Sequence, residues 1–431
     1  MGWNSRKKLS AALLTVLGIM AATLSVSLFY SVEPVKLPLV AVKTIGAPLL
    51  AHVYRQDAER VRQAVELYYV GAAECANIEP STSWNNLVSR SGMLTVVDGN
   101  GLQPIQKEVP FVYDSPETLQ LRELSAKYRL GAYLRPGTSE YGQMLALAAW
   151  VGSRWDHGVD PAPGDGGVSK PADVVAAGER GAKFWCEIAA RVTVQAATSV
   201  GWPARLVTAS SDGYNWHHAL AEIWSNQFNK WILVDTDYNI LYESDGIPLS
   251  AYELCHRGLA LRAKGRLQVV RFAPLKQSLK KADLLHLYRY VHIDLRNDWL
   301  SRSLRPGSPA GGDMATWWTA RPDMGCLLTA KERVDDQERF DWRVNSVEIH
   351  ALRLKRMSPG TFRLSIGLRG YSPYFKGFEV RLDNSEWKHL KNGRWGCVLK
   401  AGKHQIQARI ATSNGGLGPI YRVAFSIQDP S

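Results

Sequence analysis

Two stretches near the middle of the 431-residue chain decide its fold: GAKFWCEIAARVTVQAATSVGWPARLVTA (residues 181–209) and HHALAEIWSNQFNKWILVDTDYN (residues 217–239). The first predicts a helix that begins near Phe184 and carries a cysteine close to its start. Three strand-like runs with short polar gaps follow, at residues 204–209, 218–224 and 231–235. Short polar gaps favour an antiparallel sheet, because antiparallel strands can be joined by tight turns.

Three side chains in these stretches follow one another on a helix start, a strand and the end of the next strand: Cys186, His218 and Asp235. A helix N-terminus and a nearby imidazolium stabilise a thiolate, which is the reactive form of cysteine. An imidazole can carry a proton to a leaving amine, and a carboxylate on its other nitrogen orients the ring. A lone cysteine is usually structural, so it is the ordered set of three that points to chemistry.

These motifs resemble the transglutaminase-like superfamily over roughly residues 115–260, through the G-W-P-A-R turn, the H-A-x-x-E-x-W strand and the W-x-x-x-D strand. By position, Cys186 resembles the nucleophile, His218 the general base and Asp235 the orienting carboxylate. The resemblance implies a papain-like α+β core with the cysteine helix on an antiparallel sheet. It also implies cleavage or transfer of an amide acyl group through a thioester. The acidic loops of calcium-dependent relatives are not evident, so we expect no metal and no cofactor.

Neighbouring residues offer alternatives within these motifs. His217 and His218 face opposite sides of a strand, and the motif selects His218. Asp235 and Asp237 lie on one face and are harder to separate, although the motif favours Asp235. Glu222 lies on the same face as His218, where it supports the site or bonds to backbone.

Other side chains are candidates for lesser roles. An oxyanion donor is needed besides the Cys186 amide, and Trp150, Trp155 and Trp185 are near in sequence, although core packing explains each as well. We expect Arg205 to form a structural ion pair and Cys255 to be a buried thiol. The chain has five cysteines and no C-x-x-C pair, which argues against a zinc knuckle or a thioredoxin-like site.

The N-terminus predicts a membrane anchor. Three basic residues at 6–8 precede 22 residues without a charge, 9–30. A helix of that length spans a bilayer core of about 30 Å, and the flanking positive charge keeps the N-terminus in the cytoplasm. The run is longer than the apolar core of a signal peptide. We therefore expect a single-pass inner-membrane protein with a periplasmic body; the alternative is secretion after signal cleavage.

The net charge of +12 is unevenly distributed. Residues 9–250 hold 18 basic and 24 acidic residues, whereas residues 251–306 hold 12 and 4 and residues 345–431 hold 14 and 5. The expected chemistry thus lies in neutral-to-acidic surroundings. The two basic regions suit contact with an anionic surface. The chain has no zinc-finger spacing and no aromatic RNA-binding signature, so we expect no nucleic acid partner.

The remaining regions complete an expected domain order. Turn signals every 8–12 residues from 345 onward favour a β-sandwich that resembles immunoglobulin or fibronectin modules. Helices are expected at residues 250–262 and 279–290. The expected order is a basic N-terminus (1–8), a transmembrane helix (9–30), a stalk and small module with strand character (31–114), the transglutaminase-like domain (115–305), a linker (306–344) and the sandwich (345–431).

Two functions compete on this reading. The first is an extracytoplasmic cysteine enzyme that acts on a protein or peptide of the cell envelope. The second is a catalytically silent envelope protein that binds protein or polysaccharide through the papain-like domain and the basic sandwich. The residues that would carry the chemistry favour the first.

Overall fold

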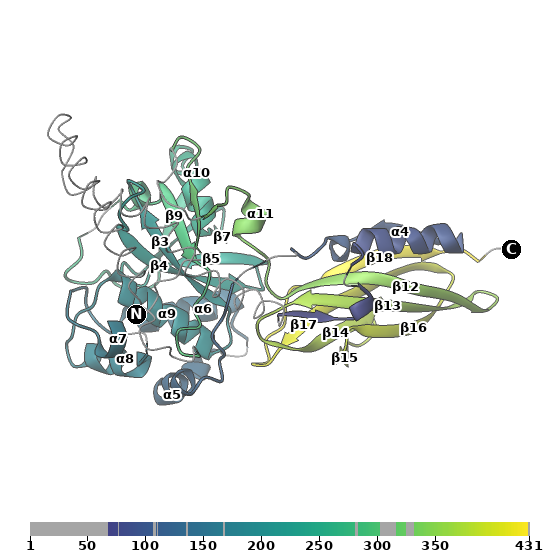
Figure 1. Cartoon of the computed structure of the whole chain (residues 1–431), viewed down its shortest axis with the longest axis horizontal. Coiled ribbons are helices and arrows are strands. Elements are labelled where there is room, and N and C mark those ends of the chain that lie inside the picture. Colours follow the sequence, from purple (N-terminus) through teal and green to yellow (C-terminus); the bar gives the residue numbers. More distant parts are fainter. Residues whose placement is uncertain are drawn as a thin grey trace, which may run out of the picture.

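The computed structural model describes residues 68–429 apart from 76, 107–108, 110, 135–136, 167–168, 281–282, 302–315 and 325–331. Figure 1 shows two lobes along the long axis, one of mixed helices and strands and one built mainly of strands. The expected membrane segment at residues 9–30 lies outside the described residues. Within the described part, no helix is both long enough and apolar enough to cross a bilayer.

The mixed lobe is built on a six-stranded sheet with the strand order β11-β10-β9-β3-β4-β5. Its strands are β3 (Ala204–Ser210), β4 (His218–Ser225), β5 (Lys230–Val234), β9 (Tyr290–Asp294), β10 (Thr316–Ala320) and β11 (Glu332–Arg333). All neighbouring pairs are antiparallel except β10 and β11. The three strands predicted between residues 204 and 235 are confirmed, and they pair antiparallel as expected.

Helix α9 (Cys186–Ser199) packs against β3 and β4 and is buried along most of its length. Four of its buried residues are alanines, whose small side chains let the helix approach the sheet closely: Ala189, Ala190, Ala196 and Ala197. The helices around it are α5 (Leu119–Tyr128), η3 (Leu130–Tyr133), α6 (Glu140–Gly152), α7 (Pro163–Gly166) and α8 (Pro171–Glu179). Helices α5, α6, α8 and α9 share one apolar core with the sheet.

A second apolar core contains residues from α10, β6, β9 and the Trp342 region. Its elements include α10 (Ala251–Ala263), η4 (Leu285–Leu287), α11 (Gln337–Phe340) and a small sheet of β6 (Ile240–Ser244), β7 (Ile247–Pro248) and β8 (Leu267–Arg271). Ser250 begins α10 with a capping box to Glu253, which explains why a helix starts there. The helix predicted at residues 250–262 is confirmed.

Two expectations for the region after α10 are wrong. The helix expected at residues 279–290 is absent from the described residues, which hold only the turn η4 before β9 begins. Val291 and Ile293 alternate inward in β9, and that period of two is the mark of a strand. The stretch 306–344 is more than a linker, because β10 pairs with β9 along its full length inside the main sheet. Its partner strand is distant in sequence, so local pattern does not reveal the pairing.

The second lobe is a sandwich of two sheets whose inner faces share one apolar core. One sheet contains β1 (Tyr69–Gly71), β12 (Ser346–Ser358), β13 (Thr361–Tyr371) and β16 (Arg394–Lys400). The other contains β2 (Leu94–Asp98), β14 (Phe375–Leu382), β15 (Lys388–Leu390), β17 (Gly402–Thr412) and β18 (Tyr421–Ile427). A β-rich C-terminal region is therefore confirmed.

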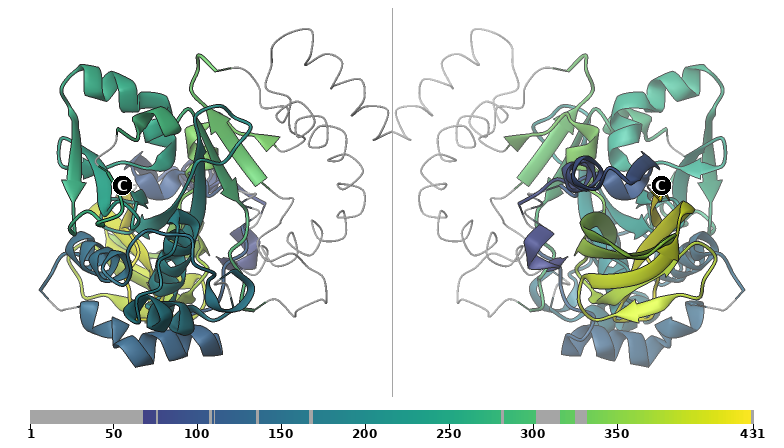
Figure 2. Two further views of the ribbon diagram at one scale, coloured as in Figure 1. Left: turned by 90° about the vertical axis from the view of Figure 1, so that its left-hand side faces the viewer. Right: turned by 90° about the vertical axis from the view of Figure 1, so that its right-hand side faces the viewer.

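The sandwich also contains residues from before the mixed lobe, a finding that differs from the separate module expected within 31–114. Strand β1 pairs with β13, β2 pairs with β18, and α4 (Pro80–Ser91) lies along the sandwich (Figure 1; Figure 2). Trp84 of α4 is fully buried and donates its Nε1–H to the Ile349 carbonyl at 2.8 Å. The short turns η1 (Ala73–Cys75) and η2 (Asn100–Leu102) join these elements. This segment contributes Trp84 and Leu94 to the apolar core of the sandwich.

The two lobes meet at the C-terminal end of α9. The Asn414 side chain, from the loop between β17 and β18, donates its Nδ2–H to the Val200 carbonyl at 2.8 Å. Gly201 has a φ of +84°, and a Cβ there would lie 2.2 Å from Asn414 Cγ. A glycine is therefore required at this contact.

Candidate active site

Cys186 is the first residue of α9, so its thiol lies at the N-terminus of a buried helix. The chain reaches it in an extended conformation: Phe184 donates its N–H to the Asp156 carbonyl, and Gly158 donates its N–H to the Phe184 carbonyl, both at 3.2 Å. The first N–H groups of a helix have no partner within the helix, and they favour negative charge nearby. The half-buried Cys186 thiol thus lies where a thiolate is stabilised.

His218 begins β4 and Asp235 follows β5, the next strand of the sheet. His218 Nε2 lies 2.8 Å from Asp235 Oδ2, and both side chains are buried. Asp235 Oδ1 accepts the backbone N–H groups of Asp237 at 3.0 Å and of Tyr238 at 2.9 Å. Both carboxylate oxygens are therefore occupied, and the carboxylate is fixed against the imidazole.

The electrostatics favour a charged His218. Burial by itself would lower the pKa of this imidazole. The charge and hydrogen bond of Asp235, together with the contact to Cys186, nevertheless hold the pKa of His218 well above its ordinary value. The Cys186 sulfur, a His218 ring nitrogen and an Asp237 oxygen all lie within 4.8 Å of one another.

Comparison with known protein families identifies the domain that carries this arrangement. The model of the transglutaminase-like superfamily matches residues 129–236, which carry α6, α9 and β3 to β5 together with Cys186, His218 and Asp235. The chain contains a transglutaminase-like superfamily domain. The resemblance seen in the sequence is thereby confirmed. No curated protein matches the chain.

The transglutaminase-like domain brings a second carboxylate to the site, which the sequence left as an alternative to Asp235. Asp237 is buried, and its Oδ2 lies 2.8 Å from His157 Nδ1. Its Oδ1 accepts a hydrogen bond from Lys276 Nζ at 3.3 Å. Sequence reasoning singled out neither His157 nor Lys276. Both belong to irregular segments far from the motifs, where no local pattern marks them.

The remaining motif residues are placed outside the cysteine–histidine contact. His217 is partly exposed, and its Nδ1 accepts the Ser211 N–H at 3.2 Å. Glu222 bonds to backbone, one of the two roles left open for it, because it accepts the Ala251 N–H at 2.6 Å. Arg205 is an ion-pair former as expected: it lies 2.6 Å from Glu222 and 2.8 Å from Asp341.

The three tryptophans proposed as oxyanion donors occupy different environments. Trp150 and Trp155 are buried in the core around α9, whereas Trp185, directly before the cysteine, is 44% exposed. The Trp155 ring packs edge-on against Phe184. Its Nε1 has no hydrogen-bond partner within the part of the chain that the structure describes.

The other described cysteines differ from Cys186. The four described cysteines are free thiols: Cys75, Cys186, Cys255 and Cys397. Burial raises the pKa of Cys75 to about 11 and that of Cys397 to about 12, and it raises the pKa of Cys255 further. Cys255 is buried as expected. Cys326 lies outside the described residues.

The same cluster provides donors of the kind that bind metals, namely a thiol, an imidazole and the Asp237 carboxylate. Both oxygens of Asp237 already have partners, however, and one partner is the Lys276 ammonium. An ammonium group beside the carboxylate repels a cation. We therefore interpret the cluster as an acid–base site.

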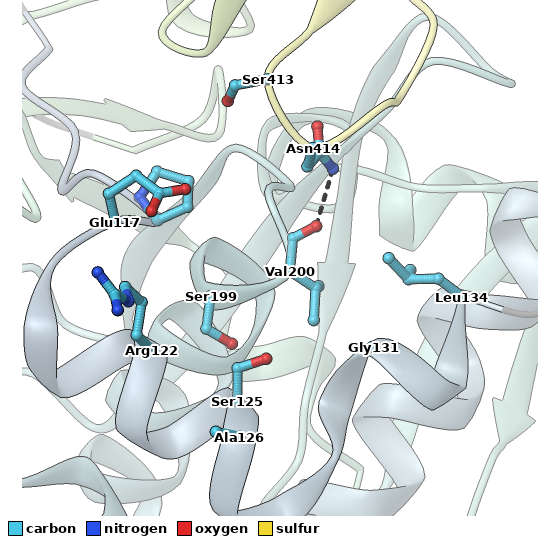
Figure 3. Close-up of a pocket in the computed structure, with 11 residues that line it drawn as sticks. Glu117, Arg122, Ser125, Ala126, Gly131, Leu134, Ser199, Val200, Ser413 and Asn414 are labelled. Carbon is cyan, nitrogen blue, oxygen red and sulfur yellow. Dashed lines mark hydrogen bonds between the residues drawn. The ribbon is translucent and has the colours of Figure 1, made fainter.

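A cavity of about 400 Å³ lies elsewhere, at the opposite end of α9 (Figure 3). It is lined by Ser199 and Val200, by Glu117 and Arg122, and by Asn414 of the sandwich. A 14-residue helix is about 20 Å long at 1.5 Å per residue, so this cavity is remote from Cys186. It belongs to the contact between the lobes and not to the cysteine site.

Proposed function

We propose that the protein is a papain-like cysteine enzyme that cleaves or transfers an amide acyl group through a thioester on Cys186. One observation carries the proposal: a helix-terminal thiol contacts a buried histidine whose other side is bonded to Asp235 at 2.8 Å. This chemistry requires a nucleophile, a base that activates it and a third group that orients the base.

Each group has a defined part in the reaction. The Cys186 thiolate attacks the amide carbonyl carbon, and the tetrahedral oxyanion accepts a hydrogen bond from the Cys186 backbone N–H at the start of α9. The protonated His218 then gives its proton to the leaving amine as the carbon–nitrogen bond breaks. This leaves an acyl thioester and a neutral imidazole, and Asp235 keeps the ring in place.

The second half of the reaction decides between hydrolysis and transfer. Neutral His218 accepts a proton from an incoming water or amine as that nucleophile attacks the thioester carbonyl, and the Cys186 thiolate leaves. Water gives a free acid, and an amine gives a new amide. The same three side chains serve both outcomes, so the nucleophile that reaches the thioester sets the reaction class.

The proposed place of action is the periplasm, with residues 9–30 as a single-pass anchor and an envelope protein or peptide as substrate. The support is the uncharged run of 22 residues behind three basic residues at 6–8. Periplasmic residence also leaves the basic sandwich close to membrane phospholipids.

The outer face of β12, β13 and β16 is a cationic face, made of Arg353, Lys355, Arg363 and Lys400. Lys355 pairs directly across the strands with Arg363, and both side chains are exposed. Like charges in that position destabilise a sheet, and an anionic partner would offset the repulsion. Exposed Val398 lies beside Arg363 on the next strand. We propose that this face contacts anionic phospholipid headgroups.

Alkylation of the full chain in detergent tests the cysteine chemistry. We expect iodoacetamide to modify Cys186 well before Cys75, Cys255 or Cys397 at neutral pH. His218→Ala should remove that advantage, because it removes the imidazolium that stabilises the thiolate. Mass spectrometry of the peptides measures both effects.

Equal, slow labelling of the described thiols would contradict the enzymatic proposal and favour the silent binding protein instead. Arg266→Met serves as a control, because Arg266 forms an exposed ion pair with Asp245 on the surface. Its labelling pattern should match that of the unmodified chain.

A further inference from the structure

The second carboxylate at the site, Asp237, needs an explanation beyond the cysteine–histidine–aspartate set. The hydrogen bond to His218 comes from Asp235, yet Asp237 is also buried and lies within 4.8 Å of the Cys186 sulfur. A carboxylate this close opposes thiolate formation, because two negative charges in a buried site repel each other. The site must therefore offset the charge of Asp237.

The offsetting charge is the Lys276 ammonium. Lys276 Nζ donates to Asp237 Oδ1 at 3.3 Å, while His157 Nδ1 lies 2.8 Å from Asp237 Oδ2. The Lys276 residue is only 7% exposed. A buried ammonium without a partner is strongly destabilising, so its burial here depends on the carboxylate.

The surroundings of Lys276 hold it in this position. Its Nζ lies over the Trp155 ring, 5.5 Å from the centroid, which adds a cation–π contact. Further along the loop, Ser278 Oγ donates to the His157 carbonyl at 2.7 Å. Before the lysine, the Pro274 carbonyl accepts Asn239 Nδ2–H at 2.6 Å. The loop is thus fastened on both sides of Lys276.

We propose that Lys276 is a positioning residue, whose ammonium neutralises Asp237 so that the thiolate of Cys186 and the imidazolium of His218 form together near neutral pH. This inference rests on the proposed function. Without Lys276, the negative charge of Asp237 would face the thiolate with no ammonium to offset it. The other titratable groups around it are His157, Tyr238 and Asp156.

The test is the pH profile of Cys186 alkylation in the full chain. Lys276→Met should shift the profile toward higher pH by about one unit or more, and thus slow alkylation about tenfold on the acidic limb of the profile. Asp237→Asn should leave it unchanged or shift it downward, since it removes the opposing charge and with it the partner that keeps the buried lysine charged. The double variant K276M/D237N should return the profile close to that of the unmodified chain.

This reversal points to charge, because the two substitutions change the charge beside the thiol in opposite directions. Lys276→Arg should keep most of the native profile. Arg266→Met is the control: Arg266 forms an exposed ion pair with Asp245, and its loss should leave the profile unchanged.

If the alkylation profiles of K276M and the unmodified chain coincide, the proposed role of Lys276 is wrong. It is also wrong if the double variant is alkylated more slowly at Cys186 than either single variant. If K276M does not fold, an upward shift of the profile for D237N would overturn it equally. An unmodified chain in which Cys186 reacts no faster than Cys75 would contradict the proposed function itself.

Discussion

At the scale of single residues, the site depends on a histidine that carries its charge while buried. His218 is 5% exposed, and burial works against its protonation. Asp235 reverses this effect, because its carboxylate is held in place by two backbone N–H groups. The protonated imidazole is therefore a stabilising feature of the folded protein as well as a reactant.

That stabilisation should depend on pH. The pKa of His218 is raised in the folded state above about 6.5, the value of an unfolded histidine. Its contribution is then fully present below about pH 6.5 and is lost as the pH rises through the folded pKa. We expect the unmodified chain to have a higher unfolding free energy than His218→Gln at pH 6. At pH 9.5 this difference should be smaller.

Urea unfolding at the two pH values measures this difference, at about 1.4 kcal/mol for each unit by which the pKa is raised. An advantage that instead grew with pH would mean that His218 is neutral in the folded protein.

At the scale of elements, Arg205 joins β3 to the neighbouring elements of the lobe. It is fully buried and donates to Glu222 of β4 at 2.6 Å and to the Phe340 carbonyl of α11 at 2.8 Å. Its guanidinium lies against the rings of both Trp231 and Trp342, at 4.3 and 4.5 Å from their centroids. In the sequence, this arginine ends the G-W-P-A-R turn. In the structure, it lies at the centre of a buried cluster of charged and aromatic side chains.

Loss of that centre should be costly. Arg205→Met leaves two buried carboxylates without their cation, which we expect to lower the unfolding free energy by roughly 3–5 kcal/mol. Arg266→Met is the matched control, because its ion pair with Asp245 is exposed and such pairs contribute about 0–1 kcal/mol. Urea titration of both variants tests the difference; similar small losses would contradict a buried cluster.

At the scale of the whole molecule, the chemistry and the cationic face occupy different lobes. The cysteine site lies in the mixed lobe, and the cationic face lies on the sandwich. The proposed anchor at residues 9–30 and this face would then give two separate attachments to a membrane. They differ physically, since insertion is apolar and resists salt, whereas headgroup contact is electrostatic and is screened.

Fractionation distinguishes the two attachments. We expect the full chain to remain with membranes through alkaline carbonate and high salt. A chain without residues 1–30 should bind anionic vesicles at low salt only, and Lys355→Ser with Arg363→Ser should weaken that binding severalfold. Extraction of the full chain by carbonate would contradict the anchor, and salt-insensitive vesicle binding would contradict the cationic face.

Local patterns predicted the parts of the fold that local interactions create. Helix α9, the strands β3 to β5 and the capped helix α10 each carry their own periodicity or capping residues, and all were recognised. Strand β10 was not predicted, because it pairs with β9, from which it is separated in the sequence by the residues between 294 and 316. The N-terminal elements of the sandwich were misplaced for the same reason, since Trp84 meets its partner Ile349 only after 265 residues.

The sequence by itself determined the transglutaminase-like domain and the order of cysteine, histidine and aspartate, because these residues lie in motifs of adjacent elements. Only the tertiary structure decided which carboxylate bonds to the histidine and what surrounds the other. Asp235 and Asp237 are two residues apart and chemically identical, so their roles depend on the partners that the fold supplies. His157 and Lys276 arrive from distant loops, and the charge balance at the thiol is a property of the folded chain.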